Sequence, residues 1–110
     1  MYSKEIIKGT LRIVILRLLD KEGRMYGYQM SKAAQELSGG KYRMSEGSLY
    51  PLLHKLEDEK LVVTESVQVG GRTRRYYRIT EAGRQTAGLQ RGEFQNFLLT
   101  MQRLLDLQLD

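Results

Sequence analysis

The stretch that decides the fold runs Ser45-Glu46-Gly47-Ser48-Leu49-Tyr50-Pro51-Leu52-Leu53-His54-Lys55-Leu56-Glu57. Its leucines follow the i, i+3, i+4, i+7 spacing of an amphipathic helix, and the Ser45 hydroxyl can cap the first turn. Pro51 lacks an N–H that a helix starting at Ser45 would use, so we expect an irregular first turn and a regular helix from about Ser48. Because the leucines must face inward, the polar side chains are left to face a partner.

Two short β-strands are expected directly after this helix. Residues 61–69 and 73–79 are rich in β-branched and aromatic side chains, and Gly70-Gly71 between them forms a turn that tolerates positive φ. Arginine occupies four of the seven positions from Arg72 to Arg78. A helix that can enter a groove, with a cationic hairpin beside it, is typical of a winged helix-turn-helix. We therefore predict a mainly α fold with a small β-hairpin, and double-stranded DNA as partner.

Two further helices are expected before this motif. The first covers about residues 4–19 and is closed by Gly23, and the second follows Tyr26-Gly27-Tyr28 and ends at Ser38-Gly39-Gly40. The first helix carries a second apolar line on the side opposite its core face, formed by Ile6, Gly9, Ile13 and Leu16. Either another helix of the same chain or a second subunit must cover this line.

Thr80 can cap a final helix that runs to about Gln108, roughly 43 Å, which is longer than a small domain is wide. Its second half carries a stripe with the alternating spacing of a coiled-coil seam. The stripe consists of Phe94, Phe97, Leu98, Met101, Leu104 and Leu105. We predict a homodimer in which this helix packs on the first helix of the other subunit, with residues 1–80 as the DNA-binding domain and residues 81–110 as the dimerisation helix.

The residues expected to contact DNA are polar, aromatic or cationic. They are Ser48, Tyr50, His54 and Lys55 on the third helix, Lys41 and Arg43 ahead of it, Tyr26 at the start of the second helix, and Arg72, Arg74 and Arg75 in the hairpin. Cationic wings grip phosphates, which gives affinity more than sequence choice. The alternatives are a merely solvated hairpin for the arginines and a plain surface position for His54.

Composition narrows the other possibilities. The 110 residues include 18 Lys and Arg against 13 Asp and Glu, a net charge of +5 that favours a polyanionic partner. The chain has no cysteine and one histidine, so we expect no disulfide, no metal site, no cofactor and no enzymatic activity. No apolar run is long enough for a membrane span, and no secretory leader is recognisable, so a soluble cytoplasmic protein is expected.

Four segments of the chain resemble the PadR family of bacterial transcriptional regulators. They are Lys8-Gly9-Thr10-Leu11, Tyr26-Gly27-Tyr28, residues 45–57 and residues 70–83. The resemblance implies a dimeric winged-helix repressor of the compact branch, which has a short C-terminal helix. An alternative from another class is a winged protein-interaction module that does not bind DNA, although the arginine-rich hairpin argues against it.

The resemblance also raises the question of a small-molecule effector. Some compact members bind aromatic or drug-like molecules between their subunits, using a tryptophan of the last helix. This chain has no tryptophan. Phe94 and Phe97 therefore either line a small apolar effector cavity or, as we favour, form plain dimer core.

Overall fold

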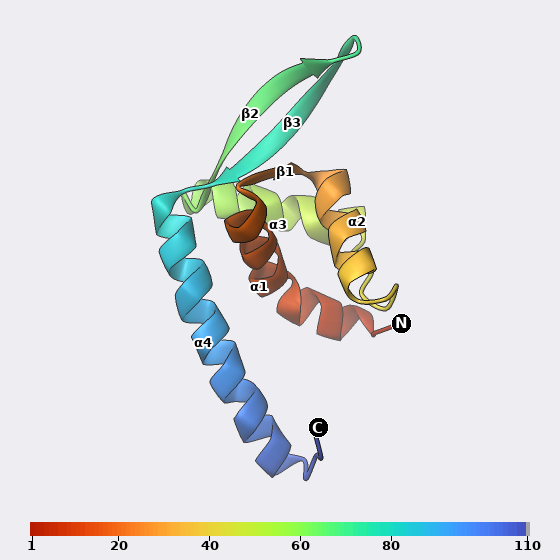
Figure 1. Ribbon diagram of the computed structural model, residues 1–110, viewed down its shortest axis with the longest axis vertical. Coiled ribbons are helices and arrows are strands. Elements are labelled where there is room, and N and C mark those ends of the chain that lie inside the picture. The colour runs from red at the N-terminus through yellow and green to blue at the C-terminus, as the bar shows by residue number, and fades with distance from the viewer. Residues whose placement is uncertain (110) are drawn as a thin grey trace.

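The computed structural model describes residues 1–109, which contain four helices and three strands. The helices are α1 (Lys4–Glu22), α2 (Gly27–Leu37), α3 (Glu46–Asp58) and α4 (Glu81–Leu104), and the strands are β1 (Arg24–Tyr26), β2 (Val62–Val69) and β3 (Arg72–Ile79). Helices α1 to α3 form a compact head, the β2–β3 hairpin projects from it, and α4 runs beside α1 and continues past the head (Figure 1). The predicted mainly α fold with a small β-hairpin is confirmed.

Helix α3 is capped by Ser45 but begins earlier than its proline suggested. The Ser48 N–H donates to the Ser45 hydroxyl (3.2 Å), and the Leu49 N–H donates to the Ser45 carbonyl (2.9 Å). These two bonds already close the first turn, so the helix starts at Glu46, and the expectation of regular helix only from Ser48 is wrong. Pro51 is tolerated inside the helix because the carbonyl it leaves without a donor belongs to Gly47, which is exposed to water.

The hydrophobic core lies between the three head helices and the inner face of the sheet. Its largest fully buried side chains are Ile15, Leu16, Leu19, Met30, Leu53, Leu56 and Val62. Of the two alternatives for the second apolar line of α1, cover by the same chain holds at Leu16, which is 0% exposed. Its assignment to the dimer interface is therefore wrong. Only Ile6 and Gly9, which are exposed, and Ile13, which is half-buried, remain of that line.

The second helix is less buried than its apolar residues suggested. Met30 and Ala34 are buried in the core. Tyr28 and Leu37, although apolar in large part, are mostly exposed. They lie at the two ends of an eleven-residue helix, where the core no longer covers them.

The sheet has three antiparallel strands in the order β1-β3-β2, where only a two-stranded hairpin was expected. The inner face carries Met25 opposite Tyr77 and Val62 opposite Ile79, and all four are buried. Strand β1 escaped prediction because three residues are too few to show alternation. At the tip, Gly70 and Gly71 have φ of 54° and 78°, as a type I′ turn requires.

The start of α4 is fastened to the root of the hairpin. The Leu61 carbonyl accepts the Thr80 N–H (3.0 Å) and the Thr80 hydroxyl (3.1 Å), while the same hydroxyl accepts the Gly83 N–H (3.0 Å). A Cβ on Gly83 would lie 2.2 Å from the Leu61 oxygen. Glycine is therefore required here by close packing.

Helix α4 ends at Leu104, four residues before the expected end at Gln108. Asp106 adopts a positive φ of 56°, and the Leu107 N–H donates to the Gln102 carbonyl (2.9 Å), which are the marks of a Schellman cap. Aspartate tolerates this conformation better than most residues do. Leu105 is the C-cap residue, whose N–H still donates to the Met101 carbonyl (2.9 Å), so it lies at the very end of the expected seam and its place in an interface stays a prediction.

Candidate nucleic-acid interface

The exposed face of α3 carries polar side chains and lies opposite the face that its leucines bury. His54 and Lys55 are exposed, whereas Leu49, Leu53 and Leu56 are buried on the opposite side. Ser48 is half-buried and accepts a hydrogen bond from the Ser45 hydroxyl (3.1 Å). The amphipathic division expected from the sequence therefore leaves a hydrophilic helix face available to a groove.

Tyr50 has a packing role that the sequence did not suggest. Its ring lies so close to Gly27, the first residue of α2, that a Cβ there would be 2.3 Å from the Tyr50 oxygen. The side chain is still 46% exposed. Partial burial is the main reason that the pKa of its hydroxyl is raised, so the hydroxyl keeps its proton and can donate a hydrogen bond.

The arginines of the hairpin do not act as one group, because strand alternation puts them on different faces. Arg72, Arg74 and Arg78 point to the outer face, and Arg75 points to the inner face with Tyr77. The guanidinium of Arg74 lies 4.2 Å over the ring of Tyr26. Among residues 1–109, Arg72 and Arg75 form no ion pair with an acidic side chain, and both are exposed.

A hollow of about 350 Å³ lies where the hairpin, α2 and α3 meet. It is lined by Tyr26, Gly27, Tyr50, Arg74, Arg75 and Tyr77. The hollow therefore brings together five residues from three separate segments that carry phenol or guanidinium groups. Four of these five were predicted to contact DNA; the fifth, Tyr77, is buried in the sheet.

Lys41 and Arg43 lie on the loop between α2 and α3 and are both exposed there. The Arg43 Nε donates to the Gly40 carbonyl (3.2 Å), so part of that guanidinium is held against the loop.

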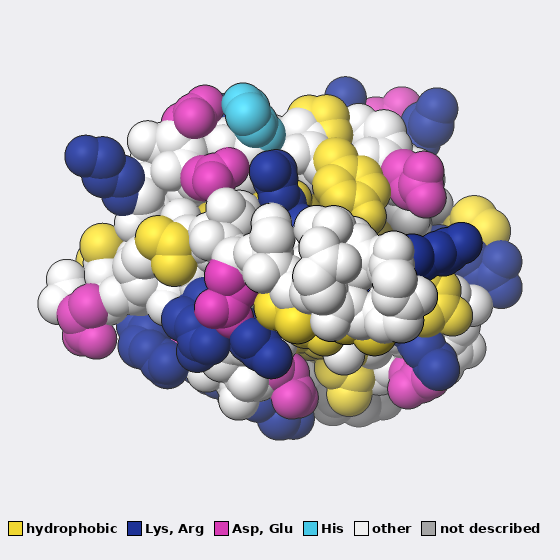
Figure 2. All heavy atoms as spheres, turned by 90° about the horizontal axis from the view of Figure 1, so that it is seen from above, with side chains coloured by type: hydrophobic (Ala, Val, Ile, Leu, Met, Phe, Trp, Pro, Cys, Tyr) yellow, Lys and Arg dark blue, Asp and Glu magenta, His cyan; other side chains and the backbone are white. Residues whose placement is uncertain are grey.

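Figure 2 looks down on the β2–β3 hairpin, here called the wing, and shows Lys and Arg side chains spread over this end of the molecule, with Asp and Glu side chains between them. The positive charge is thus distributed around the wing and not gathered into one patch.

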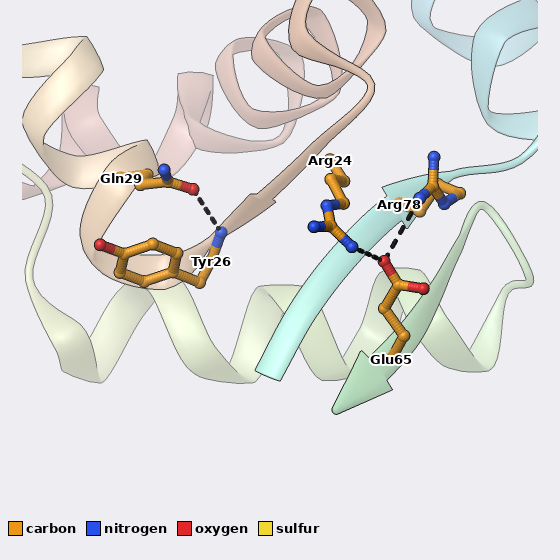
Figure 3. A network of polar contacts seen from close by, with 5 residues as sticks. All are labelled: Arg24, Tyr26, Gln29, Glu65 and Arg78. Atoms are coloured by element: carbon orange, nitrogen blue, oxygen red, sulfur yellow. Dashed lines mark hydrogen bonds and ion pairs between the residues drawn. The ribbon is translucent and has the colours of Figure 1, made fainter. Parts of the chain in front are cut away.

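The outer face of the sheet carries a network that sequence reasoning missed. Glu65 of β2 accepts hydrogen bonds through one oxygen from Arg24 of β1 and from Arg78 of β3, the latter at 3.2 Å (Figure 3). Arg24 also lies 4.4 Å over the ring of Tyr76. The available signal was a single acid in an otherwise cationic hairpin, but its partner strand β1 was not predicted.

The residues assigned to the dimer and to an effector lie at the other end of the molecule. Phe97, Leu98 and Leu104 are largely exposed, whereas Phe94 and Met101 are half-buried. The rings of Phe94 and Phe97 pack against each other with centroids 5.9 Å apart.

Residues 1–109 contain no cluster of three His, Asp or Glu side chains suited to a metal ion. Within the same residues, no helix has both the length and the apolar character that crossing a membrane requires.

Comparisons with known proteins agree on one family. The family described as the transcriptional regulator PadR-like family matches residues 15–88. A transcriptional regulator of Mycobacterium tuberculosis is 58% identical over 50 residues, 46% of this chain and 47% of that protein. The match therefore spans about half the length of that regulator.

Two solved structures resemble the whole chain more closely in shape than in sequence. A transcriptional regulator from Clostridium thermocellum has 27% identity and a TM-score of 0.83, with 94% of this chain and 97% of that chain covered. A PadR family transcriptional regulator from Eggerthella lenta has 27% identity and a TM-score of 0.79, with 94% and 88% covered.

Proposed function

Because this chain belongs to the PadR-like family of transcriptional regulators, we propose that it is a dimeric repressor that binds an operator in double-stranded DNA. Membership in a family of DNA-binding transcriptional regulators, and not of enzymes, agrees with the sequence-based expectation. The repressor role, the dimer and the operator contacts are the proposal. The observation that carries it is the arrangement of α3 and the wing: a hydrophilic helix face and two unpaired arginines project from the same end of the head.

The proposed DNA contacts divide into two kinds. On α3, Ser48 in the first turn and His54 and Lys55 in the third turn are the proposed contacts in the major groove, where side chains of a recognition helix reach base edges. The remaining candidates hold the backbone: Tyr26, Lys41, Arg43, Tyr50, Arg72, Arg74 and Arg75. Their contacts supply affinity and register but little sequence choice.

For the dimer, we propose that residues 81–110 form the interface and residues 1–80 the DNA-binding unit. The apolar stripe on α4 supports this, since Phe97 and Leu104 are 49% and 70% exposed and water covers them at a free-energy cost. The remaining free residues of α1, namely Ile6, Gly9 and Ile13, are the proposed acceptor for the partner's α4.

An effector would have to bind within this same interface. Phe94 and Phe97 already pack on each other, which favours a role as dimer core. If a small apolar molecule releases the repressor, these two rings are the proposed contacts.

The experiment that tests DNA binding is a titration of duplex at increasing salt concentration. Contacts with four to eight phosphates across a dimer give a slope of log affinity against log salt of about −4 to −7. A flat dependence would instead favour a winged protein-interaction module. The operator itself is best found by recovering the fragments that the protein retains from its own genome, and it should be an inverted repeat with half-site centres about 34 to 36 Å apart, or a multiple.

A further inference from the structure

The direction of the wing is set at its root. Strand β1 pairs with β3 only at Tyr76, Tyr77 and Arg78, so the rest of the hairpin is held by β2–β3 pairing alone. The unpaired arginines Arg72 and Arg75 lie in that projecting half. A small rotation at the root would therefore displace them relative to α3.

The root is fixed on its outer face by ionic and aromatic contacts in place of a hydrophobic core. Glu65 bridges Arg24 and Arg78, and so joins all three strands through one carboxylate oxygen (Figure 3). Arg24 covers the ring of Tyr76, and Tyr76 meets the ring of Tyr26 edge-on with centroids 5.4 Å apart. Each contact orients the next one.

The same contacts reach the helix-turn-helix. Tyr26 is the residue from which α2 starts, and its N–H donates to the Gln29 side chain (3.1 Å) in the first turn of that helix (Figure 3). On its other side, the Tyr26 ring supports the guanidinium of Arg74. A continuous series of contacts therefore runs from Glu65 in the wing to the start of α2.

The negative charge of Glu65 is unexpected on a hairpin that is proposed to approach DNA. A carboxylate on a hairpin that approaches phosphates repels them, so by electrostatics alone it weakens DNA binding. The hydrogen bond from Arg24, together with the positive charges of Arg24 and Arg78, lowers the pKa of Glu65 below the usual glutamate range, so it stays ionised at neutral pH.

We propose that Glu65 is a positioning residue: through Arg24, Arg78 and the Tyr76–Tyr26 pair it locks the wing at the angle to α2 and α3 that lets both reach one duplex. The proposal rests on the DNA-binding function proposed above. Two contact surfaces held at the correct separation bind together far better than two loosely connected ones. Loss of the lock thus weakens DNA binding even though it removes a repulsive charge.

The test compares two acid-to-amide variants that change the net charge equally. Glu65→Gln removes both ion pairs of the lock and leaves only an amide oxygen, a weaker acceptor, for Arg24 and Arg78. Glu46→Gln removes an exposed acid from the first turn of α3 without touching the hairpin. On a 30-base-pair duplex we expect Glu46→Gln to bind about two- to threefold more tightly because one repulsion is gone. We expect Glu65→Gln to bind at least about threefold more weakly.

A spectroscopic readout separates positioning from general destabilisation. The chain has no cysteine, so spin labels can be placed at Val69→Cys near the wing tip and Asp58→Cys at the end of α3. The labelled protein is diluted with unlabelled chains so that only distances within one subunit are measured. We expect Glu65→Gln to broaden the wing-to-α3 distance distribution, and Arg24→Gln added to it to broaden it no further.

The outcomes are distinct. Tighter or unchanged DNA binding by Glu65→Gln, or a distance distribution as narrow as that of the parent protein, would overturn the positioning role. If the parent protein binds no duplex at all, the proposed function fails, and the distance measurement still decides whether Glu65 holds the wing.

Discussion

The wing and the far end of α4 are both surfaces that their own chain leaves uncovered, but they differ in chemistry. Arg72 and Arg75 on the wing are exposed cations that water hydrates well, so the isolated protein tolerates them. Phe97, Leu98 and Leu104 on α4 are exposed apolar side chains that water disfavours. The difference fits the two occupants proposed above: DNA, which would bind reversibly at the wing, and a second copy of the chain, which would stay bound at α4.

The two halves of α4 sharpen the same contrast. Gly83 and Ala87 are buried in the first half, where α4 lies against α1, and at 100° per residue they lie on the same helix face as Phe94 and Met101. The face therefore continues into the second half of α4, where its own chain covers it only in part: Phe94 and Met101 are half-buried.

The largest effect should come from Phe97→Asp combined with Leu104→Asp. Two charges in an apolar seam remove its hydrophobic gain of about 1.5–3 kcal/mol per side chain and add a desolvation cost, so the dimer should dissociate completely. Sedimentation velocity measures this. The matched control is Asn96→Asp with Leu99→Asp, which introduces two aspartates and removes one leucine on the opposite side of α4. If both double variants stay dimeric, the seam is not the interface.

The next effect should come from Gly83→Ala, which forces a methyl group against the Leu61 carbonyl. We expect the free energy of unfolding to fall by about 1–3 kcal/mol through overpacking. Gly88→Ala is the control, because nothing lies within 4 Å of a Cβ there. That change should stabilise the helix by about 1 kcal/mol. Urea unfolding at one fixed protein concentration measures both, and effects of the same sign would contradict the packing argument.

A smaller effect is expected from Arg72→Ala combined with Arg75→Ala. Each lost phosphate contact should reduce the steepness of the salt dependence by about 0.9 per subunit, and affinity should fall by a similar factor for all duplex sequences. Arg91→Ala combined with Arg103→Ala removes the same charge from exposed positions of α4 and should leave binding as it was. A loss confined to one operator would instead assign base reading to the wing.

The smallest effect should be a pH dependence that belongs to the head and not to α4. The hydrogen bond from Arg12 of α1 lowers the pKa of Glu59, at the end of α3, below its ordinary value. The pKa of Glu59 is lower in the folded state than in the unfolded state, so the pair stabilises the fold fully at pH values above the ordinary pKa of a glutamate. This stabilisation is lost as the pH falls through the lowered pKa of the folded state. Both side chains remain partly exposed to water, so the contribution should stay below about 1 kcal/mol. Glu59→Gln should remove this component from urea-unfolding free energies measured across the acid range, and an unchanged pH dependence would assign it to other carboxylates.

Local chemistry made most of the fold predictable. Gly23 and the Gly70-Gly71 turn act through their own backbone and Ser45 acts through its hydroxyl, so the end of α1, the hairpin turn and the capping residue of α3 followed from the sequence. Leu16 and Tyr50 did not. Their surroundings are set by α4 and by Gly27, which are distant in sequence, and no local pattern records such contacts.

The candidate site was predictable in kind more than in arrangement. The hydrophilic face of α3 followed from the leucine spacing, and the cationic hairpin followed from composition. The division of the arginines between two faces required the strand register, and the role of Glu65 required β1. A three-residue strand forms only because β3 offers it an edge, so its existence depends on tertiary structure.

The junction at the Leu61 carbonyl has a consequence for operator choice. Thr80 and Gly83 fasten α4 to the segment between α3 and β2, so the head and α4 move together as one rigid body. In the proposed dimer the two heads would therefore be held at a fixed separation. An extra base pair inserted between the half-sites could be absorbed only by overwinding or underwinding the DNA.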